Sequence, residues 1–169
     1  MRAIPISLLL VLTLLLGACG FHLRGQGAFA LPFQTLYVQS ANDFAPFIVE
    51  LKHAIEANSV QIADTPDKAQ LTLHIVSEVA DKQILSLSGG GRVREYRLQY
   101  RVSLRAYDHE QRDWLAPEEI TMQRDFSYDD TQVLAKEQEE TLLYQNMRSD
   151  AVQQVLRRLN HAKLPQAAP

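Results

Sequence analysis

The stretch REYRLQYRVSLRAY, residues 94–107, alternates apolar and polar side chains more regularly than any other part of the chain. One set of positions is apolar: Tyr96, Leu98, Tyr100, Val102, Leu104 and Ala106. The positions between them are polar: Arg97, Gln99, Arg101, Ser103 and Arg105. Because successive side chains of a β-strand point to opposite faces, this period of two predicts a long strand that is buried on one face only.

A glycine-rich turn and a second long strand precede this stretch. Residues 88–91, SGGG, suit a tight turn. Leu71, Leu73 and Ile75 alternate with Thr72 and His74, which predicts a half-buried strand that extends to about Leu87. Two long strands joined by glycines predict a β-hairpin. The other predicted segments are a strand at 34–39, a loop at 108–117 that includes Trp114, and a strand at 118–126.

Two segments have the apolar spacing of amphipathic helices. Asn42 or Asp43 can cap the first helix and Asn58 can end it. Its apolar stripe consists of Phe44, Phe47, Ile48, Leu51 and Ile55. The second helix is predicted from Thr131 to His161, with Asp130 as its cap. Its apolar stripe consists of Leu143, Met147, Ala151, Val152, Val155, Leu156 and Leu159.

The early turns of the second helix differ from the rest of it. Residues 136–141, KEQEET, contain no apolar side chain. A helix segment without an apolar stripe has nothing to bury against a sheet. We therefore expect these turns to project past the sheet or to face a partner.

The order of elements is strand, helix, three strands, helix. Each helix has one apolar stripe and the sheet has one apolar face, so the simplest way to bury all three is a two-layer sandwich. We predict an α+β fold in which both helices pack on one face of a four-stranded mixed sheet. The opposite face is then open and carries Arg97, Arg101 and Arg105.

The N-terminus has the pattern of an export signal. Arg2 is followed by an apolar run of about 13 residues, which is shorter than the roughly 20 that a membrane-spanning helix needs. Leu16-Gly17-Ala18-Cys19 then resembles the lipobox of bacterial lipoproteins, in which the cysteine is acylated after the leader is cut. Cys19 is the only cysteine in the chain, and acylation accounts for an unpaired thiol in an exported protein.

These features predict four parts of the chain: a signal peptide at 1–18, a lipidated start and tether at 19–33, one α+β domain at 34–161, and a flexible tail at 162–169. Lipoproteins that stay at the inner membrane commonly have Asp after the cysteine. Gly20 occupies that position here, so the resemblance implies the outer membrane.

Composition and motifs argue against several classes of function. A net charge of −3 does not suggest a nucleic-acid partner. The histidines are scattered without metal-ligand spacing, and no nucleophile or phosphate-binding motif is present, so we expect no metal, no cofactor and no catalysis. The acidic pairs at 118–119 and 129–130 are compatible in principle with acid–base work.

Basic residues extend from the hairpin turn down the long strand: Arg92, Arg94, Arg97, Arg101 and Arg105. Arginine binds phosphates and carboxylates through two parallel hydrogen bonds. Two interpretations remain open at this point. The series either binds the phosphates of lipopolysaccharide (LPS), or it only solubilises an exposed sheet face.

Three stretches resemble the LptE family of LPS-assembly lipoproteins. They are CGFHLRG at 19–25, REYRL at 94–98, and VLAKEQEE at 133–140 with VLRRL at 155–159. The resemblance implies an outer-membrane lipoprotein, anchored through Cys19 on the periplasmic side. The family plugs and helps to assemble the LptD β-barrel and binds LPS without catalysing a reaction.

The resemblance also implies site residues. Lys136 matches a basic position of the family that is linked to LPS binding. The second basic position of the family lies in the hairpin turn, where this chain has SGGG, so Arg92 and Arg94 are the nearest substitutes. His22 and Arg24 belong to the first motif, but their role does not follow from it. The alternative is a lipoprotein that scaffolds or pilots another envelope complex without binding LPS; a periplasmic hydrolase is a third class.

Overall fold

The computed structural model describes residues 31–163, so the predicted signal peptide, Cys19, His22 and Arg24 lie outside the described residues. The elements are β1 (Thr35–Gln39), α2 (Pro46–Glu56), β2 (Gln61–Ile62), the 3₁₀ helix η1 (Pro66–Lys68), β3 (Leu71–Leu87), β4 (Val93–Tyr107), β5 (Asp113–Ser127) and α3 (Val133–His161). The predicted order of long strands and helices is confirmed, and the predicted boundaries of the four parts stay predictions.

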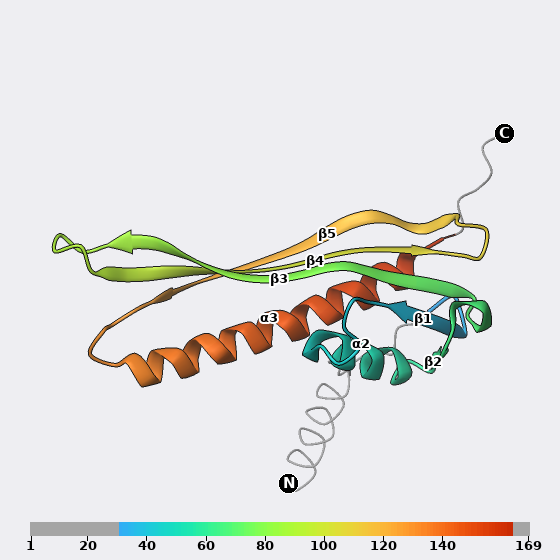
Figure 1. The fold of residues 1–169 in the computed structure, drawn as a ribbon, viewed down its shortest axis with the longest axis horizontal. Helices are drawn as coiled ribbons and strands as arrows, with labels where there is room; N and C mark the ends of the chain where they lie inside the picture. The colour runs from blue at the N-terminus through green and yellow to red at the C-terminus, as the bar shows by residue number, and fades with distance from the viewer. Residues whose placement is uncertain (1–30, 164–169) are drawn as a thin grey trace, which may run out of the picture.

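The strands form one sheet in the order β2-β1-β3-β4-β5. Strand β1 is parallel to β2 and to β3, whereas β3, β4 and β5 are antiparallel neighbours, so the sheet is mixed. Both helices cover the same face (Figure 1). The predicted two-layer α+β sandwich is therefore confirmed. The fifth strand, β2, is only two residues long, and a segment that short has no detectable alternation.

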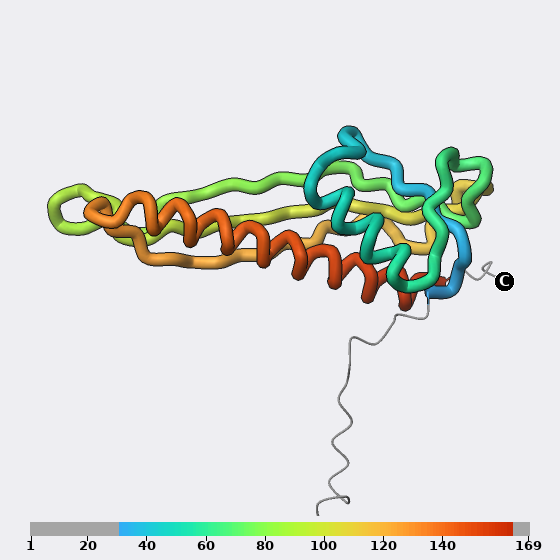
Figure 2. Tube along the Cα trace, turned by 90° about the horizontal axis from the view of Figure 1, so that it is seen from below, coloured from blue at the N-terminus to red at the C-terminus, as the bar shows by residue number. Residues whose placement is uncertain are grey.

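The molecule is elongated, with a base formed by β1, β2 and α2 and a distal end formed by the turn between β3 and β4 (Figures 1 and 2). Helix α2 covers only the base, whereas α3 follows the sheet for most of its length. Contrary to one of our two expectations, the first turns of α3 do not project past the sheet. They lie beside the hairpin, where Lys82 Nζ is 2.7 Å from Glu140 Oε2.

The core lies between the sheet and the two helices. The alternating apolar positions of β4 are buried from Leu98 to Ala106, and the half-buried Tyr96 packs against this core. The predicted stripe of α3 is buried from Met147 to Leu159. Leu143 is only partly buried at the edge of this core.

The start of α2 differs from the prediction. The N-cap position is Ala45 with Pro46 following it, and neither Asn42 nor Asp43 caps the helix with its side chain. The side chain of Asn42 instead accepts a hydrogen bond of 3.0 Å from the backbone N–H of Phe44. This turn lies before the helix, and Phe44 is 88% exposed, so it does not belong to the buried stripe.

The start of α3 also differs from the prediction. The N-cap position is Gln132, and Asp130 does not cap the helix. Asp129 organises the preceding turn, because its Oδ1 accepts hydrogen bonds from the backbone N–H of Thr131 at 2.9 Å and from the Thr131 hydroxyl at 2.7 Å. Local hydrogen bonds of this kind compete with helix capping, and a sequence pattern cannot rank the two.

The turn between β4 and β5 is shorter than predicted, and Trp114 lies in β5 instead of a loop. The carboxylate of Asp108, which is 8% exposed, holds this turn together. It accepts hydrogen bonds from the backbone N–H groups of Glu110 and Arg112, from Arg112 Nε and from Trp114 Nε1, at 2.9–3.4 Å.

We expect Asp108→Ala to lower the free energy of unfolding by about 2–3 kcal/mol, because it removes the buried carboxylate that accepts four hydrogen bonds in this turn. Burial raises the pKa of Asp108, but the hydrogen bonds from Arg112 and Trp114 outweigh it and hold the pKa below 3.8. The contribution of a group with a lowered pKa is present above its unfolded value and is lost as pH falls through the folded value. Urea denaturation at pH 7 and pH 3 measures both effects.

Asp67→Ala is the matched control, since Asp67 is exposed on η1. We expect the difference in the free energy of unfolding between the two variants to be smaller at pH 3 than at pH 7. Equal stability of the two variants at pH 7 would contradict a structural role for the Asp108 carboxylate.

Candidate functional site

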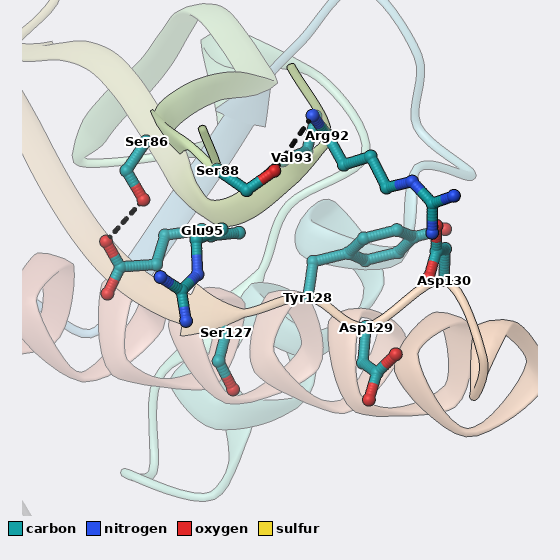
Figure 3. Close-up of a pocket in the computed structure, with 10 residues that line it drawn as sticks. Ser86, Ser88, Arg92, Val93, Glu95, Ser127, Tyr128, Asp129 and Asp130 are labelled. Carbon is teal, nitrogen blue, oxygen red and sulfur yellow. Dashed lines mark hydrogen bonds and ion pairs between the residues drawn. The ribbon is translucent and has the colours of Figure 1, made fainter. Parts of the chain in front are cut away.

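The distal end holds an open pocket of about 600 Å³ (Figure 3). It lies where the β3–β4 turn, the start of β4 and the end of β5 meet. Its lining residues are Ser86, Ser88, Arg92, Val93, Arg94, Glu95, Ser127, Tyr128, Asp129 and Asp130. Two of the predicted site residues, Arg92 and Arg94, are therefore in one pocket.

The predicted glycine turn forms one wall of this pocket. The backbone N–H of Ser88 donates to the carbonyl of Arg92 at 2.7 Å, and that of Gly91 donates to the carbonyl of Ser88 at 2.9 Å. Gly91 has a φ of 77°, a conformation that glycine adopts without a steric cost. The Ser88 hydroxyl oxygen also accepts from the backbone N–H of Arg92 at 3.1 Å. These bonds fix the backbone from which the Arg92 side chain extends.

Lys136 reaches the same region from α3. Its Nζ lies 3.3 Å from the hydroxyl of Ser127, which lines the pocket, and 2.8 Å from Glu139 Oε2. The Lys136 side chain is only 16% exposed, so it is held against the end of β5. The fold thus brings Lys136, which is far from Arg92 and Arg94 in the sequence, to the same end of β5 as these two arginines.

The three cations differ in what they contact. The Arg92 guanidinium is 77% exposed and pairs with Asp130 at 3.0 Å. Arg94 is exposed and forms no ion pair within residues 31–163, so its charge is available to a ligand. Lys136 is already paired with Glu139.

Carboxylates lie among these cations, which the sequence analysis did not foresee. Glu95 accepts a hydrogen bond from Ser86, and Asp129 and Asp130 line the opposite wall (Figure 3). The backbone N–H and hydroxyl of Thr131, with a smaller effect of the Lys136 charge, lower the pKa of Asp129. The pocket is therefore of mixed charge and is not a purely basic patch.

Tyr128 is a lining residue that sequence reasoning missed. Its ring packs edge-on against Tyr96, with ring centroids 5.2 Å apart. Its backbone N–H donates to the carbonyl of Arg94 at 2.7 Å. Tyr128 directly follows the last residue of β5. An aromatic residue at the end of a strand is the feature of the sequence that could have identified it.

The remaining arginines of the basic series are not free. Arg97 contacts Asp125 at 2.8 Å, Arg101 contacts Asp81 at 3.0 Å, and Arg105 contacts Asp113 at 3.1 Å. Hydrogen bonds from Arg97 lower the pKa of Asp125. Each pair joins β4 to a neighbouring strand on the open face of the sheet. Of the two interpretations, solubilising a sheet face therefore fits these three arginines better.

Within residues 31–163, no group of three or more His, Cys, Asp or Glu side chains is arranged to hold a metal ion. In that range no helix is long and apolar enough to cross a lipid bilayer. The distal pocket with Lys136 beside it is therefore the candidate site that the geometry favours.

The fold is that of known bacterial lipoproteins. Lipoprotein B of Nitrosomonas europaea, solved in solution by NMR, superposes with a TM-score of 0.69 at 38% identity, over 82% of this chain and 88% of that one. The rare lipoprotein B of Shewanella oneidensis superposes with a TM-score of 0.66 at 26% identity, over 73% of this chain and 92% of that one.

The sequence comparisons are more specific. A family model described as LptE, lipopolysaccharide-assembly, matches residues 33–159. The LPS-assembly lipoprotein LptE of Yersinia enterocolitica is 30% identical over 94% of this chain and 77% of its own length. That of Pectobacterium atrosepticum is 29% identical over 94% of this chain and 86% of its own length. The chain belongs to the LptE family, and the resemblance predicted from its motifs is confirmed.

Proposed function

We propose that this protein is a lipid-anchored lipoprotein of the outer membrane that plugs and helps to assemble the LptD barrel and binds LPS during its delivery to the cell surface. Membership of the LPS-assembly family is the observation that carries the proposal. In this proposal Cys19 bears the acyl chains, and the domain works on the periplasmic side. No reaction is catalysed.

The LPS part of the proposal rests on the distal pocket. Lipid A carries phosphates, and arginine and lysine are the side chains that recognise phosphate. Arg94 forms no ion pair among the described residues, and Lys136 is fixed close by. The Arg92–Asp130 pair is exposed. An exposed pair contributes about 0–1 kcal/mol, so a phosphate can replace Asp130 at small cost.

The plug part of the proposal is supported by the open sheet face. The lumen of a membrane β-barrel is polar. The outer face of β4 carries arginines that are neutralised by carboxylates on both neighbouring strands. A flat surface of paired charges and hydroxyls suits a polar wall, because it needs neither burial in lipid nor a counter-ion.

Lys136→Asp combined with Arg94→Asp tests the phosphate contacts. We expect the affinity for LPS to fall about tenfold or more, since charge-assisted hydrogen bonds contribute about 1.5–3 kcal/mol each and repulsion replaces them. Both residues lie outside the core, so folding and co-purification with LptD should be unchanged. Titration of the purified full chain with LPS measures the affinity.

Lys68→Asp combined with Arg157→Asp is the matched control, because it makes the same change of charge at exposed residues of η1 and of the last turns of α3, outside the distal pocket. An equal loss in both double variants would indicate a general charge effect. Unchanged LPS affinity in the distal variant would discard the phosphate contacts and leave the barrel role in place. Absence of LptD from the co-purified material would instead favour another envelope complex.

A further inference from the structure

Strand β3 has a long free edge. Its pairing with β1 covers Leu71–His74 and ends there, although β3 continues to Leu87. From residue 76 to residue 87, β4 is its only partner strand within the described residues. At about 3.3 Å per residue this edge is about 40 Å long. An edge of this kind presents backbone N–H and C=O groups that a further strand can pair with.

The free edge of β3 is also apolar. Five of its side chains are exposed: Val76 at 54%, Val79 at 39%, Ile84 at 58%, Leu85 at 41% and Leu87 at 56%. These five are half of the large exposed hydrophobic residues of the described chain. An exposed apolar edge is a liability unless something covers it.

Strand β5, at the opposite edge of the sheet, provides the comparison. It also has a single partner strand, but it carries Pro117 and a series of charged residues, and none of its large hydrophobic side chains is among the exposed ones. Proline and charges are the devices by which proteins protect an edge from pairing. Strand β3 also carries charged residues, but it has no proline and it exposes five large hydrophobic side chains, so its edge is the less protected of the two.

The regular part of the β3 edge ends at an irregularity in the pairing with β4 on each side. Shifts in register with β4 occur between Ile75 and Ser77 and again between Ile84 and Ser86, so Ser77–Ile84 is the regular segment. Bulges bend a strand and end regular pairing. The regular segment is therefore long enough for one added strand of ordinary length, which is about 5–6 residues.

The polar groups of this segment restrict its partner. The Lys82 ammonium is occupied, with Glu140 at 2.7 Å and the centre of the Tyr96 ring at 4.8 Å. The Asp81 carbonyl accepts a hydrogen bond from the Tyr144 hydroxyl at 2.7 Å. The Glu78 carboxylate accepts one from the Tyr100 hydroxyl at 2.6 Å and has no ion pair within residues 31–163. A partner that supplies Lys or Arg opposite Glu78 is therefore favoured by charge.

We infer that the free edge of β3, centred on Ser77–Ile84, accepts an extended polypeptide segment as a sixth strand. The segment has apolar side chains beside Val79 and Ile84 and a basic one opposite Glu78. A strand can pair with the free backbone groups of this edge other than the Asp81 carbonyl, whereas a lipid or a helix cannot. The identity of the donor rests on the proposed function: the segment belongs to the barrel partner, LptD.

The experiment uses the full chain co-purified with LptD. Hydrogen exchange followed by mass spectrometry should show the edge amides of residues 77–84 exchanging at least tenfold more slowly in the complex than in the free chain. Val79→Asp combined with Ile84→Asp should lower the yield of the complex about tenfold. Both side chains are substantially exposed, and thermal unfolding of the free variant checks that it still folds.

Phe44→Asp combined with Val49→Asp is the matched control, because it also replaces two exposed apolar side chains by carboxylates, at the start of α2 and away from the sheet edges. The control should leave the yield unchanged, and protection should not extend to the β5 edge. If the complex forms but residues 77–84 exchange at the free rate, the added strand is wrong and the proposed function stands. If no LptD co-purifies at all, the proposed function fails together with the assigned donor.

Discussion

Replacement of Cys19 by alanine is expected to abolish stable attachment to membranes. Burial of each acyl methylene contributes about 0.8 kcal/mol, and one chain alone gives only marginal binding. A cysteine that bears several chains is therefore a strong anchor, and its replacement should remove nearly all membrane attachment. No helix within residues 31–163 can replace it as a span. Flotation on phospholipid vesicles, compared between the unchanged protein and the Cys19→Ala variant, measures the change.

Leu134→Ser is the control for this result, because Leu134 is 77% exposed and is the apolar group of α3 most available to a membrane surface. It should float with the vesicles as the unchanged chain does. Flotation of the Cys19→Ala variant, or loss of flotation in the Leu134→Ser variant, would show that the protein surface carries the attachment. Intact mass of the native protein independently shows whether Cys19 is acylated.

The sequence predicted those parts of the fold that depend on periodicity. The alternation in β4 and the apolar stripe of α3 each extend over many residues, so single exceptions do not hide them. The ends of the elements depend on single hydrogen bonds, and there the prediction failed. The sequence predicts a loop at Trp114, whereas the structure has it in β5, because the buried carboxylate of Asp108 shortens the turn before it. No pattern in the sequence marks that carboxylate as buried.

The candidate site was predicted only in part, for a similar reason. Lys136 and Arg94 followed from resemblance and charge, and their proximity depends on how α3 lies beside the hairpin. The paired state of Arg97, Arg101 and Arg105 could not be predicted, because it depends on which carboxylate each neighbouring strand places opposite. The number of arginines on one strand overestimates the positive charge of the sheet face when aspartates of the neighbouring strands pair with them.

The free edge of β3 is a feature that sequence analysis cannot distinguish from paired strand. It belongs to the same strand as the paired residues at the base, and only the short length of β1 leaves the rest of β3 without a neighbour on that side. Strand β1 ends after Gln39, because the chain then turns into α2. The length of one strand therefore determines how much backbone of another is left for a partner.

Phe47→Ala is expected to lower the free energy of unfolding by about 3–5 kcal/mol, the cost of removing a buried aromatic ring together with the cavity it leaves. Phe47 is fully buried under the sheet, and its ring meets that of Tyr100 edge-on, with centroids 6.3 Å apart. A domain of this size has a total stability of about 5–15 kcal/mol, so the loss is a large fraction of it. Urea denaturation of the mature domain measures it.

Phe44→Ala removes the same side chain three positions earlier, where it is 88% exposed, and is therefore the matched control. Its effect should stay within about 0.5 kcal/mol, as for other surface substitutions. Similar losses in both variants would mean that Phe44 is covered in solution and that α2 begins earlier than the structure has it. A small loss in both would mean that α2 is not part of the core, and the two-layer arrangement at the base would then be wrong.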